Sequence, residues 1–572
     1  FSFTSLIGHG MKIYLKTPGV FACLLVSAGL SATVVLAADI DVLDKQQREI
    51  PAPRSQPPLR IVEDGGETAG PDESLRFVLD KLTVVGAGTF SSDELTAPYR
   101  EHYGRETSFA RIGAIAGEMT RRYRDAGYLF SRVVVPVDQG ALDPQHAEVR
   151  LMAIEGFISR VDYEGDADLI ERLKAYWGGV EARLTEMRPL RHADFEREML
   201  LLSDVPGLSV SSRFEEGAGE GATVLVLTAR QRLVEFSLNA GNTGTESAGR
   251  GLVTANASLN HPFFLGGRTT LGFTQAAHRR EYASVSLSHA HRFANGLTAS
   301  FSWTKSDSPE PDSDFARRFD YETASETVTA GVDHSFIRGR DLNLSAGVSY
   351  EHRDSRSDLS GERYTRDRLR GLTVEANLDF SDGWGDGGVT QIVPTYTRGL
   401  SWASATDRDP DASASIAPAR FNRLKLYLSH NRSLPGDFSL FAAAEAQFAD
   451  ESLSSYYRYA LGGSQFGRGY ASGEVENDEG YAFSLEGRWN TTLAGWSVSP
   501  FVFFDIGKVW ARHGQGRDRV ASHGIGFRLS ADSLSFAAGR FSLTTFAARA
   551  DKDAGEVDAG DVRYMLQAVY GY

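Results

Sequence analysis

The chain is 572 residues long, carries a formal net charge of −15 and contains a single cysteine. One cysteine excludes a disulfide framework, and the excess of acidic side chains argues against nucleic acid as a partner. A chain of this length is expected to hold more than one domain.

Residues 1–38 have the pattern of a secretory signal. Lys12 and Lys16 precede an apolar stretch that ends in two alanines, which is the order of regions in exported precursors. We expect translation to start at Met11, residues 1–10 to be upstream read-through, and Cys23 to leave with the signal. A lipoprotein acylated on Cys23 is the less favoured alternative, because cleavage there would leave a long apolar tail.

Residues 39–50 are polar and can form a short helix. Residues 51–75 follow with a proline-rich start and no hydrophobic period, which predicts an extended tether. The two segments together predict a tethered helix that can occupy another part of the molecule. A disordered spacer is the alternative.

Residues 76–156 predict a small α+β module. Ser91 and Glu94 form a capping-box pattern, in which the two side chains satisfy the first free amides of a helix. Ser108 can cap a second helix, because apolar residues recur after it at helical spacing. Alternation predicts strands at 77–85, 132–137 and 149–154.

The same order of elements recurs in residues 157–231. Helices are expected at 169–176 and 192–202, and strands at 158–163, 208–214 and 224–227. Each three-stranded sheet would leave an exposed edge, to which an extended client chain can add a strand through main-chain hydrogen bonds. Alternatively, the two modules serve only as assembly handles or spacers.

Residues 232–572 predict a closed sheet that crosses a membrane. Runs such as 342–350, 438–448 and 481–489 alternate apolar and polar side chains, and a tilted crossing strand needs roughly 9–11 residues. A soluble β-sandwich also alternates, but it rarely chains so many strands with aromatic ends. About sixteen strands fit, with expected centres at Phe236, Ala255, Phe273, Val285, Ala299, Ala330, Ala346, Ala376, Thr395, Leu426, Ala442, Leu485, Phe503, Ile525, Leu543 and Leu566.

A long connection, 449–479, interrupts these strands with the glycine-rich motif Gly462, Gly463, Phe466, Gly467, Arg468, Gly469 and Tyr470. In the strand near residue 503, the outward parity of Val502, Phe504 and Ile506 turns Asp505 inward, together with Phe503 and Gly507. An inward carboxylate in a half-dry lumen favours a cation, and an arginine between glycines can approach the wall closely. Arg468 could pair with Asp505, and the family resemblance given below implies that it does. For Arg468 alone, a solvated loop arginine would be the alternative.

The chain ends in a strand pattern whose last residue is aromatic. Tyr564, Leu566, Tyr570 and Tyr572 share one face, as in the terminal strand of outer-membrane proteins generally. This resemblance implies that assembly machinery reads these four residues as a C-terminal barrel signal.

These features resemble the Omp85 superfamily. The Gly-Gly and Arg-Gly-Tyr elements around Arg468 are similar to the sixth extracellular loop of its transporters, and the Phe503, Asp505 and Gly507 pattern is similar to the strand motif whose acid pairs with the loop arginine. The two modules resemble polypeptide-transport-associated (POTRA) domains. With the tethered helix, the chain resembles the TpsB transporters of two-partner secretion, of the ShlB, FhaC and HecB type. The segment 260–268 departs from the family, whose members tend to have Asn-Pro and Gly-Asp there.

The resemblance implies a transmembrane antiparallel β-barrel in the outer membrane of a Gram-negative bacterium. Two POTRA domains would lie in the periplasm, and a helix at 39–50 would plug the lumen. The function implied is secretion, and activation in some cases, of a large TpsA-like exoprotein without nucleotide hydrolysis. Expected partners are this client, outer-membrane lipid, the barrel assembly machinery and periplasmic chaperones, and no nucleic acid.

No enzyme activity, catalytic residue, cofactor or metal is expected, because phosphate loops, nucleophile elbows and zinc-ligand spacings are missing from the sequence. His289 and His291 share a strand face and could form a weak metal pair, but ordinary strand histidines are favoured. Three other functions stay open. They are an assembly factor that inserts other barrels, a passive porin, and an outer-membrane hydrolase.

Overall fold

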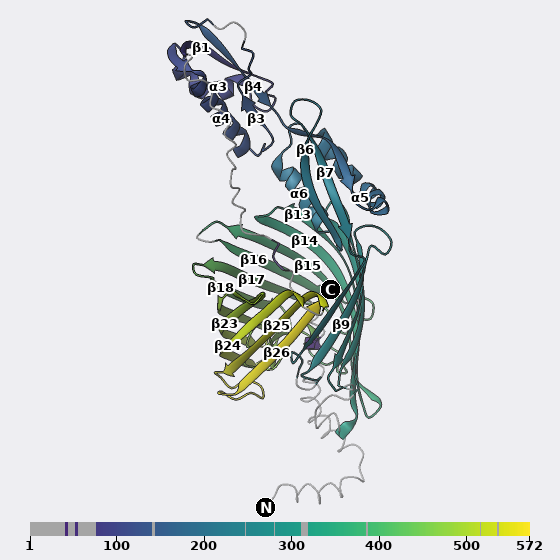
Figure 1. Ribbon diagram of the computed structural model, residues 1–572. Helices are drawn as coiled ribbons and strands as arrows, with labels where there is room; N and C mark the ends of the chain where they lie inside the picture. The colour runs from purple at the N-terminus through teal and green to yellow at the C-terminus, as the bar shows by residue number, and fades with distance from the viewer. Residues whose placement is uncertain are drawn as a thin grey trace, which may run out of the picture.

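The computed structural model describes residues 41–43, 52–54, 76–139, 143–245, 248–278, 281–309, 318–384, 387–514, 516–534 and 537–572. Two α+β modules precede a closed barrel (Figure 1). The expected signal, 1–38, lies outside the described residues, as do most of the helix at 39–50 and of the tether at 51–75. No helix in the described part of the chain is both long enough and apolar enough to cross a membrane.

The first module is built on a sheet with the strand order β2-β1-β4-β3, against which one long helix packs. The capping box is confirmed, because the Glu94 amide donates to Ser91 Oγ at 3.2 Å and the Ser91 amide donates to Glu94 Oε2 at 2.8 Å. Its elements are β1 (Arg76–Val85), α3 (Ser92–Thr96), η1 (Ala97–His102), β2 (Arg105–Ser108), α4 (Phe109–Asp125), β3 (Arg132–Val134) and β4 (Ala147–Ile154).

This module differs from the prediction in two strands. β2 is not among the predicted strands, and it forms because its four residues pair antiparallel with the start of β1. β3 ends at Val134 instead of residue 137, because Pro136 has no amide hydrogen to donate to a ladder.

A half-buried carboxyl group ties the end of β4 to the loop after β1. Glu155 Oε1 accepts hydrogen bonds from the amides of Gly88 at 2.9 Å and Thr89 at 2.7 Å, and from the Tyr123 hydroxyl at 2.9 Å. Burial acts to raise the pKa of Glu155, but these hydrogen bonds outweigh it and leave the pKa below its ordinary value. The ionised form of Glu155 therefore stabilises the module.

The second module has the predicted element order and the strand order β5-β7-β6. Its long helix continues beyond the predicted end at residue 176, because the buried stripe of Trp177, Val180 and Leu184 outweighs the two glycines that follow Trp177. β6 is left as a nine-residue edge strand. The elements are β5 (Phe157–Glu164), α5 (Ala167–Glu186), α6 (His192–Ser203), β6 (Leu208–Glu216) and β7 (Ala222–Gln231).

The barrel is a closed antiparallel sheet of sixteen strands, which confirms the predicted architecture. Each predicted centre falls in its own strand, and β22 (Thr491–Leu493) only continues β21 along β23 after a break. The strands are β8 (Val234–Gly241), β9 (Leu252–Asn260), β10 (Gly267–Ala276), β11 (Ala283–Arg292), β12 (Leu297–Ser308), β13 (Tyr321–Arg338), β14 (Leu342–Leu359), β15 (Glu362–Asp382), β16 (Gly388–Gly399), β17 (Asn422–Leu434), β18 (Phe438–Ala449), β21 (Glu479–Trp489), β23 (Trp496–Trp510), β24 (Arg517–Leu534), β25 (Ala537–Ala550) and β26 (Val562–Gly571).

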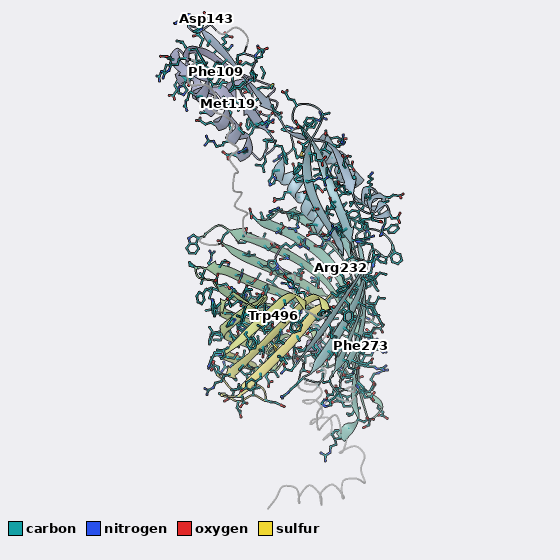
Figure 2. All side chains as sticks on the ribbon, in the orientation of Figure 1. Phe109, Met119, Asp143, Arg232, Phe273 and Trp496 are labelled. Atoms are coloured by element: carbon teal, nitrogen blue, oxygen red, sulfur yellow. The ribbon has the colours of Figure 1, made fainter. Side chains whose placement is uncertain are left out.

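Side chains alternate between the two faces of the barrel wall as predicted. Val502 and Phe504 are 59% and 43% exposed on the outer face, whereas Asp505 is 0% exposed on the inner face. Phe273 also points outward from the wall and is 46% exposed (Figure 2). The last residue closes the seam between β26 and β8, because the Tyr572 amide donates to the Phe236 carbonyl at 2.8 Å.

The second module sits on the rim of the barrel, beside the Arg232 junction (Figure 2). Asp204, which follows α6, accepts from the Arg338 guanidinium at 2.9 Å and from Arg292 Nη1 at 3.2 Å. The tether residue Arg54 reaches the same carboxylate at 3.5 Å. The N-terminal segment therefore passes this rim before it enters the first module.

Candidate functional site

The connection between β18 and β21 folds back into the barrel. It contains η2 (Ser455–Tyr457) and a hairpin of β19 (Tyr459–Leu461) and β20 (Val475–Asn477). Its buried apolar side chains pack against wall residues Val509 and Val520 in one hydrophobic cluster. We call the residues 450–478 loop 6, because five connections precede it at the barrel end away from the modules.

Arg468 at the tip of loop 6 binds two acids of the barrel wall. Its Nε and Nη2 donate to the two oxygens of Asp505 at 2.9 and 2.8 Å, and its amide donates to Asp505 Oδ2 at 2.9 Å. Its Nη1 donates to Glu486 Oε2 at 2.6 Å, and its Nη2 also donates to Ser484 Oγ at 2.9 Å. The structure thus brings Arg468 and Asp505 together as a bidentate pair, and it adds Glu486 as a second acid.

This cluster is enclosed within the wall. The side chains of Arg468, Asp505 and Glu486 are 4%, 0% and 2% exposed, and the Arg468 guanidinium lies 3.5 Å from the centre of the Phe503 ring. Arg488 and Arg528 donate to the other side of Glu486 at 2.5 Å. A buried carboxylate without a cation is costly, so Asp505, which Arg468 neutralises, holds the loop arginine in place.

Glycines let the tip of loop 6 approach the wall. Gly462 has a φ of 107°, and a Cβ there would lie 1.9 Å from the Ala471 carbonyl oxygen. A Cβ on Gly469 would lie 2.8 Å from Ser522 Cβ, so a side chain beside Arg468 would push the loop off the strand. Gly463 and Gly467 also have positive φ, at 107° and 71°.

The remaining motif residues also anchor the loop, whereas the residues predicted as a C-terminal barrel signal lie in or next to β26. The Tyr470 hydroxyl lies 2.9 Å from the Ala521 carbonyl oxygen, and Phe466 is buried. Gly507 faces inward, where a Cβ would lie 2.7 Å from Leu461 Cδ1. Three of the four residues of this predicted signal are exposed, namely Tyr564, Leu566 and Tyr572. The fourth, Tyr570, lies in β26.

Residues 41–43 are helical and lie inside the barrel, where they meet both loop 6 and the wall. Asp41 Oδ1 accepts from Arg353 Nη2 of β14 at 2.6 Å, and Asp41 Oδ2 accepts from Ser455 Oγ of loop 6. The Arg353 side chain is 1% exposed. Leu43 packs against the wall in a cluster with Tyr282. One carboxylate therefore links the N-terminal segment to two other parts of the chain.

Sequence reasoning does not name Glu486, Arg528, Arg353 or Ser455. Alternation could have placed Glu486 on the inner face, because Phe483 and Leu485 point outward. No comparable signal exists for Ser455, since its position depends on how loop 6 folds.

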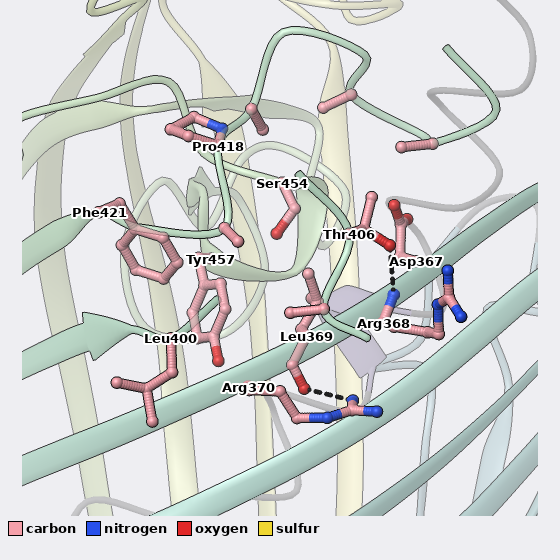
Figure 3. A pocket seen from close by; sticks show the side chains of 15 residues that line it. Asp367, Arg368, Leu369, Arg370, Leu400, Thr406, Pro418, Phe421, Ser454 and Tyr457 are labelled. Carbon is pink, nitrogen blue, oxygen red and sulfur yellow. Dashed lines mark hydrogen bonds between the residues drawn. The ribbon is translucent and has the colours of Figure 1, made fainter. Parts of the chain in front are cut away.

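The connection 400–421 covers the end of β15 that lies away from the modules, and it reaches loop 6. Figure 3 shows Phe421 and Leu369 beside Tyr457 at this junction. The space between them is about 10 Å³, which leaves room for about one water molecule. Loop 6 is thus packed on both the tip side and the base side. His289 of β11 contacts Thr269 Oγ1 at 2.9 Å.

The family described as haemolysin secretion/activation protein ShlB/FhaC/HecB matches residues 220–529, more than half of the chain. This chain belongs to the ShlB/FhaC/HecB family. The ShlB-type POTRA domain matches residues 77–156. The resemblance seen in the sequence is therefore confirmed.

Two curated relatives are similar over most of their length. The heme/hemopexin transporter protein HuxB of Haemophilus influenzae is 22% identical over 77% of this chain and 78% of its own. The outer membrane transporter CdiB of Escherichia coli is 25% identical over 78% of this chain and 75% of its own. The solved structure of CdiB from Escherichia coli matches with a TM-score of 0.68 and 20% identity, covering 95% of this chain and 98% of that one, which shows the same fold.

The ShlB/FhaC/HecB protein described here is an outer-membrane transporter of two-partner secretion, with its POTRA region in the periplasm. Its family is one of transporters that work with TpsA-like exoprotein partners through POTRA domains. The family assignment favours secretion over the assembly-factor, porin and hydrolase alternatives. Loop 6 consequently lies at the extracellular end of the barrel, opposite the periplasmic modules.

Proposed function

We propose that the barrel lumen is the path of an unfolded client and that two inserts close it at rest. These inserts are the helix at 39–50 and loop 6. The observation that carries the proposal is the Asp41 carboxylate, which is shared between Arg353 of the wall and Ser455 of loop 6. An incoming chain that displaces the helix also removes a contact that supports loop 6.

The client would first meet the periplasmic modules, which we take as POTRA domains at 76–156 and 157–231. β6 is a nine-residue edge strand, and its residues after Leu208 are mostly exposed, so an extended chain can add to the sheet there. In the first module the edge strands β2 and β3 have only four and three residues. The second module is therefore the favoured docking site.

Passage would need no nucleotide hydrolysis and no catalytic residue. The client crosses in an extended form through the barrel at 232–572, and its folding outside prevents return. Arg468 and the motif glycines keep loop 6 against Asp505 and Glu486 in the resting state. During biogenesis, periplasmic chaperones would deliver the chain and the assembly machinery would read Tyr564, Leu566, Tyr570 and Tyr572.

A reversible cross-link tests this proposal. Asp41→Cys and Ser455→Cys would be combined with Cys23→Ser, because Cys23 is the chain's single cysteine. A disulfide or short cross-linker between the new thiols should fix the helix to loop 6 and abolish secretion of the paired exoprotein, and reduction should restore it. The single variant Ser455→Cys, treated in the same way, is the control. Secretion at the wild-type rate with the cross-link intact would show that the client takes another path.

A further inference from the structure

The outer face of the barrel carries a group of basic side chains at its extracellular end. Lys508 of β23 lies opposite Arg519 of β24, and His523 of β24 lies opposite Arg549 of β25. All four lie on the outer face. Lys508 has the parity of Phe504, opposite the inward Asp505, and Arg519 and His523 have the parity of the exposed Ile525. We call Lys508, Arg519, His523 and Arg549 the basic patch.

Most of this positive charge is not neutralised by the protein. The His523 ring contacts Asp551 at 2.9 Å. In the described part of the chain, Lys508, Arg519 and Arg549 make no ion pair. The outer faces of β12 and β14 differ, since their charges alternate in sign and pair along the strand, as Lys305 with Asp307 and Arg356 with Asp358. Lys508, Arg519 and Arg549 can therefore bind an anion from outside the chain.

An aromatic pair marks the height of the basic patch in the membrane. The rings of Tyr481 and Trp510 lie 6.1 Å apart at the outer ends of β21 and β23, and aromatic girdles of this kind flank the apolar band of a barrel. Tyr481 lies directly opposite Lys508 in the sheet. The patch is therefore level with lipid head groups rather than with acyl chains.

An apolar groove begins two residues below His523 and Arg549 of the basic patch and six residues below Lys508 and Arg519, counted along their strands. It has a volume of about 790 Å³ and crosses six strands at Leu440, Gly487, Val502, Ile525, Ala547 and Tyr564, which form one continuous row in the sheet register. The groove exists because two small residues, Gly487 and Ala547, interrupt this row of larger side chains. Ile525 follows His523 by two residues, and Ala547 precedes Arg549 by two residues. Each pair therefore lies on the same outer face. Cations and groove thus form one surface.

We propose that this surface binds one phosphorylated glycolipid of the outer leaflet. The phosphate groups contact Lys508, Arg519 and Arg549, and an acyl chain fills the groove. Charge complementarity selects an anionic head group, and the hydrocarbon surroundings select an acyl chain for an apolar hollow. The lipid would fix the wall formed by β23, β24 and β25, which is the wall that supplies Asp505 to the loop 6 tip.

Native mass spectrometry of the full chain in detergent tests the assignment, with diphosphorylated lipid A as the probe. Lys508→Ala, Arg519→Ala and Arg549→Ala combined should weaken binding roughly hundredfold, at about fivefold for each lost cation near the membrane surface. A matched control removes three exposed arginines of the first periplasmic module, Arg105, Arg121 and Arg132, and should bind like the wild type. Electrophoretic mobility without boiling reports that every variant barrel is folded.

A second variant tests the groove without changing charge. Gly487→Leu would place its side chain in open space, because the nearest atom to a Cβ there is Val502 Cγ2 at 3.8 Å. It should lower lipid A binding at least fivefold while the patch is intact. Dephosphorylated lipid should bind the wild type weakly, and inorganic phosphate should not compete. Equal binding by the triple variant, or full competition by inorganic phosphate, would overturn the proposal.

Discussion

Replacing Arg468 with alanine should detach loop 6 from the barrel wall while the barrel itself stays folded. Among the residues that the structure describes, Asp505 would keep only the Ser484 hydroxyl, at 2.8 Å, whereas Glu486 would keep Arg488 and Arg528. Leaving one buried charge without its cation costs about 3–5 kcal/mol. At 1.4 kcal/mol for each factor of ten, the population of detached loop should rise by roughly 10² to 4 × 10³.

Trypsin cleavage after Arg458 on intact cells measures this population. Arg458 lies in loop 6, and its side chain is 21% exposed and pairs with Glu476 at 3.3 Å, so cleavage requires the loop to leave the wall. The Arg468→Ala variant should be cut much faster and should lose secretion of its exoprotein. Its boiled and unboiled electrophoretic mobilities should match those of the wild type.

The double variant Arg468→Ala with Asp505→Asn is the control for the charge argument. A neutral side chain at position 505 removes the unpaired anion, so cleavage after Arg458 should slow again toward the wild-type rate. If the single variant were cut at the wild-type rate, or if the double variant were cut as fast as the single one, the ion pair would not hold the loop.

Three further outcomes follow from other contacts. Asp41→Ala removes the buried partner of Arg353 and should raise the frequency of open-channel events in planar bilayers roughly 10²-fold, whereas Ser455→Ala, which loses one neutral hydrogen bond, should raise it about tenfold or less. Gly469→Ala should accelerate loop 6 cleavage, because its Cβ meets β24, whereas Gly487→Ala on the outer face should not. The pKa of the Glu155 carboxyl is lower in the folded module than in the unfolded chain. Ionised Glu155 therefore stabilises the folded module above the unfolded pKa of about 4.3, and this stabilisation is lost as the pH falls through the folded pKa. Hydrogen exchange at the amides that bond Glu155, corrected for the intrinsic rate, should therefore lose protection below about pH 4.3 in the wild type and be pH-independent in Glu155→Gln.

Alternation carries most of the architecture, because one apolar face toward lipid leaves a period of two in every strand. It identifies the inner face that bears Asp505 before any partner is known. It does not give the lengths of β13, β14 and β15, which have 18, 18 and 21 residues and extend beyond a single crossing. Those extensions are held by neighbouring strands and loops outside the lipid, where no apolar face is needed.

Long-range contacts inside the lumen are the part that local patterns cannot supply. Asp41 and Arg353 are 312 positions apart, and neither has neighbours that mark it as one half of an ion pair. Glu486 is recognisable as inward by its parity, but its contact with Arg468 depends on the path of loop 6. The sequence therefore identifies a charged inner wall more readily than it identifies which charges meet.

The two anchors of loop 6 differ in strength, and this difference orders the events of opening. The tip at Arg468 has five hydrogen bonds to three wall residues and stacks on Phe503. The helical segment is tied to loop 6 by the hydrogen bond between Asp41 and Ser455. Breaking the weaker link first requires less free energy, so the helix should leave while the loop tip stays on the wall. Asp41→Ala should accordingly open the channel without faster cleavage after Arg458, and faster cleavage in that variant would show that helix and loop leave together.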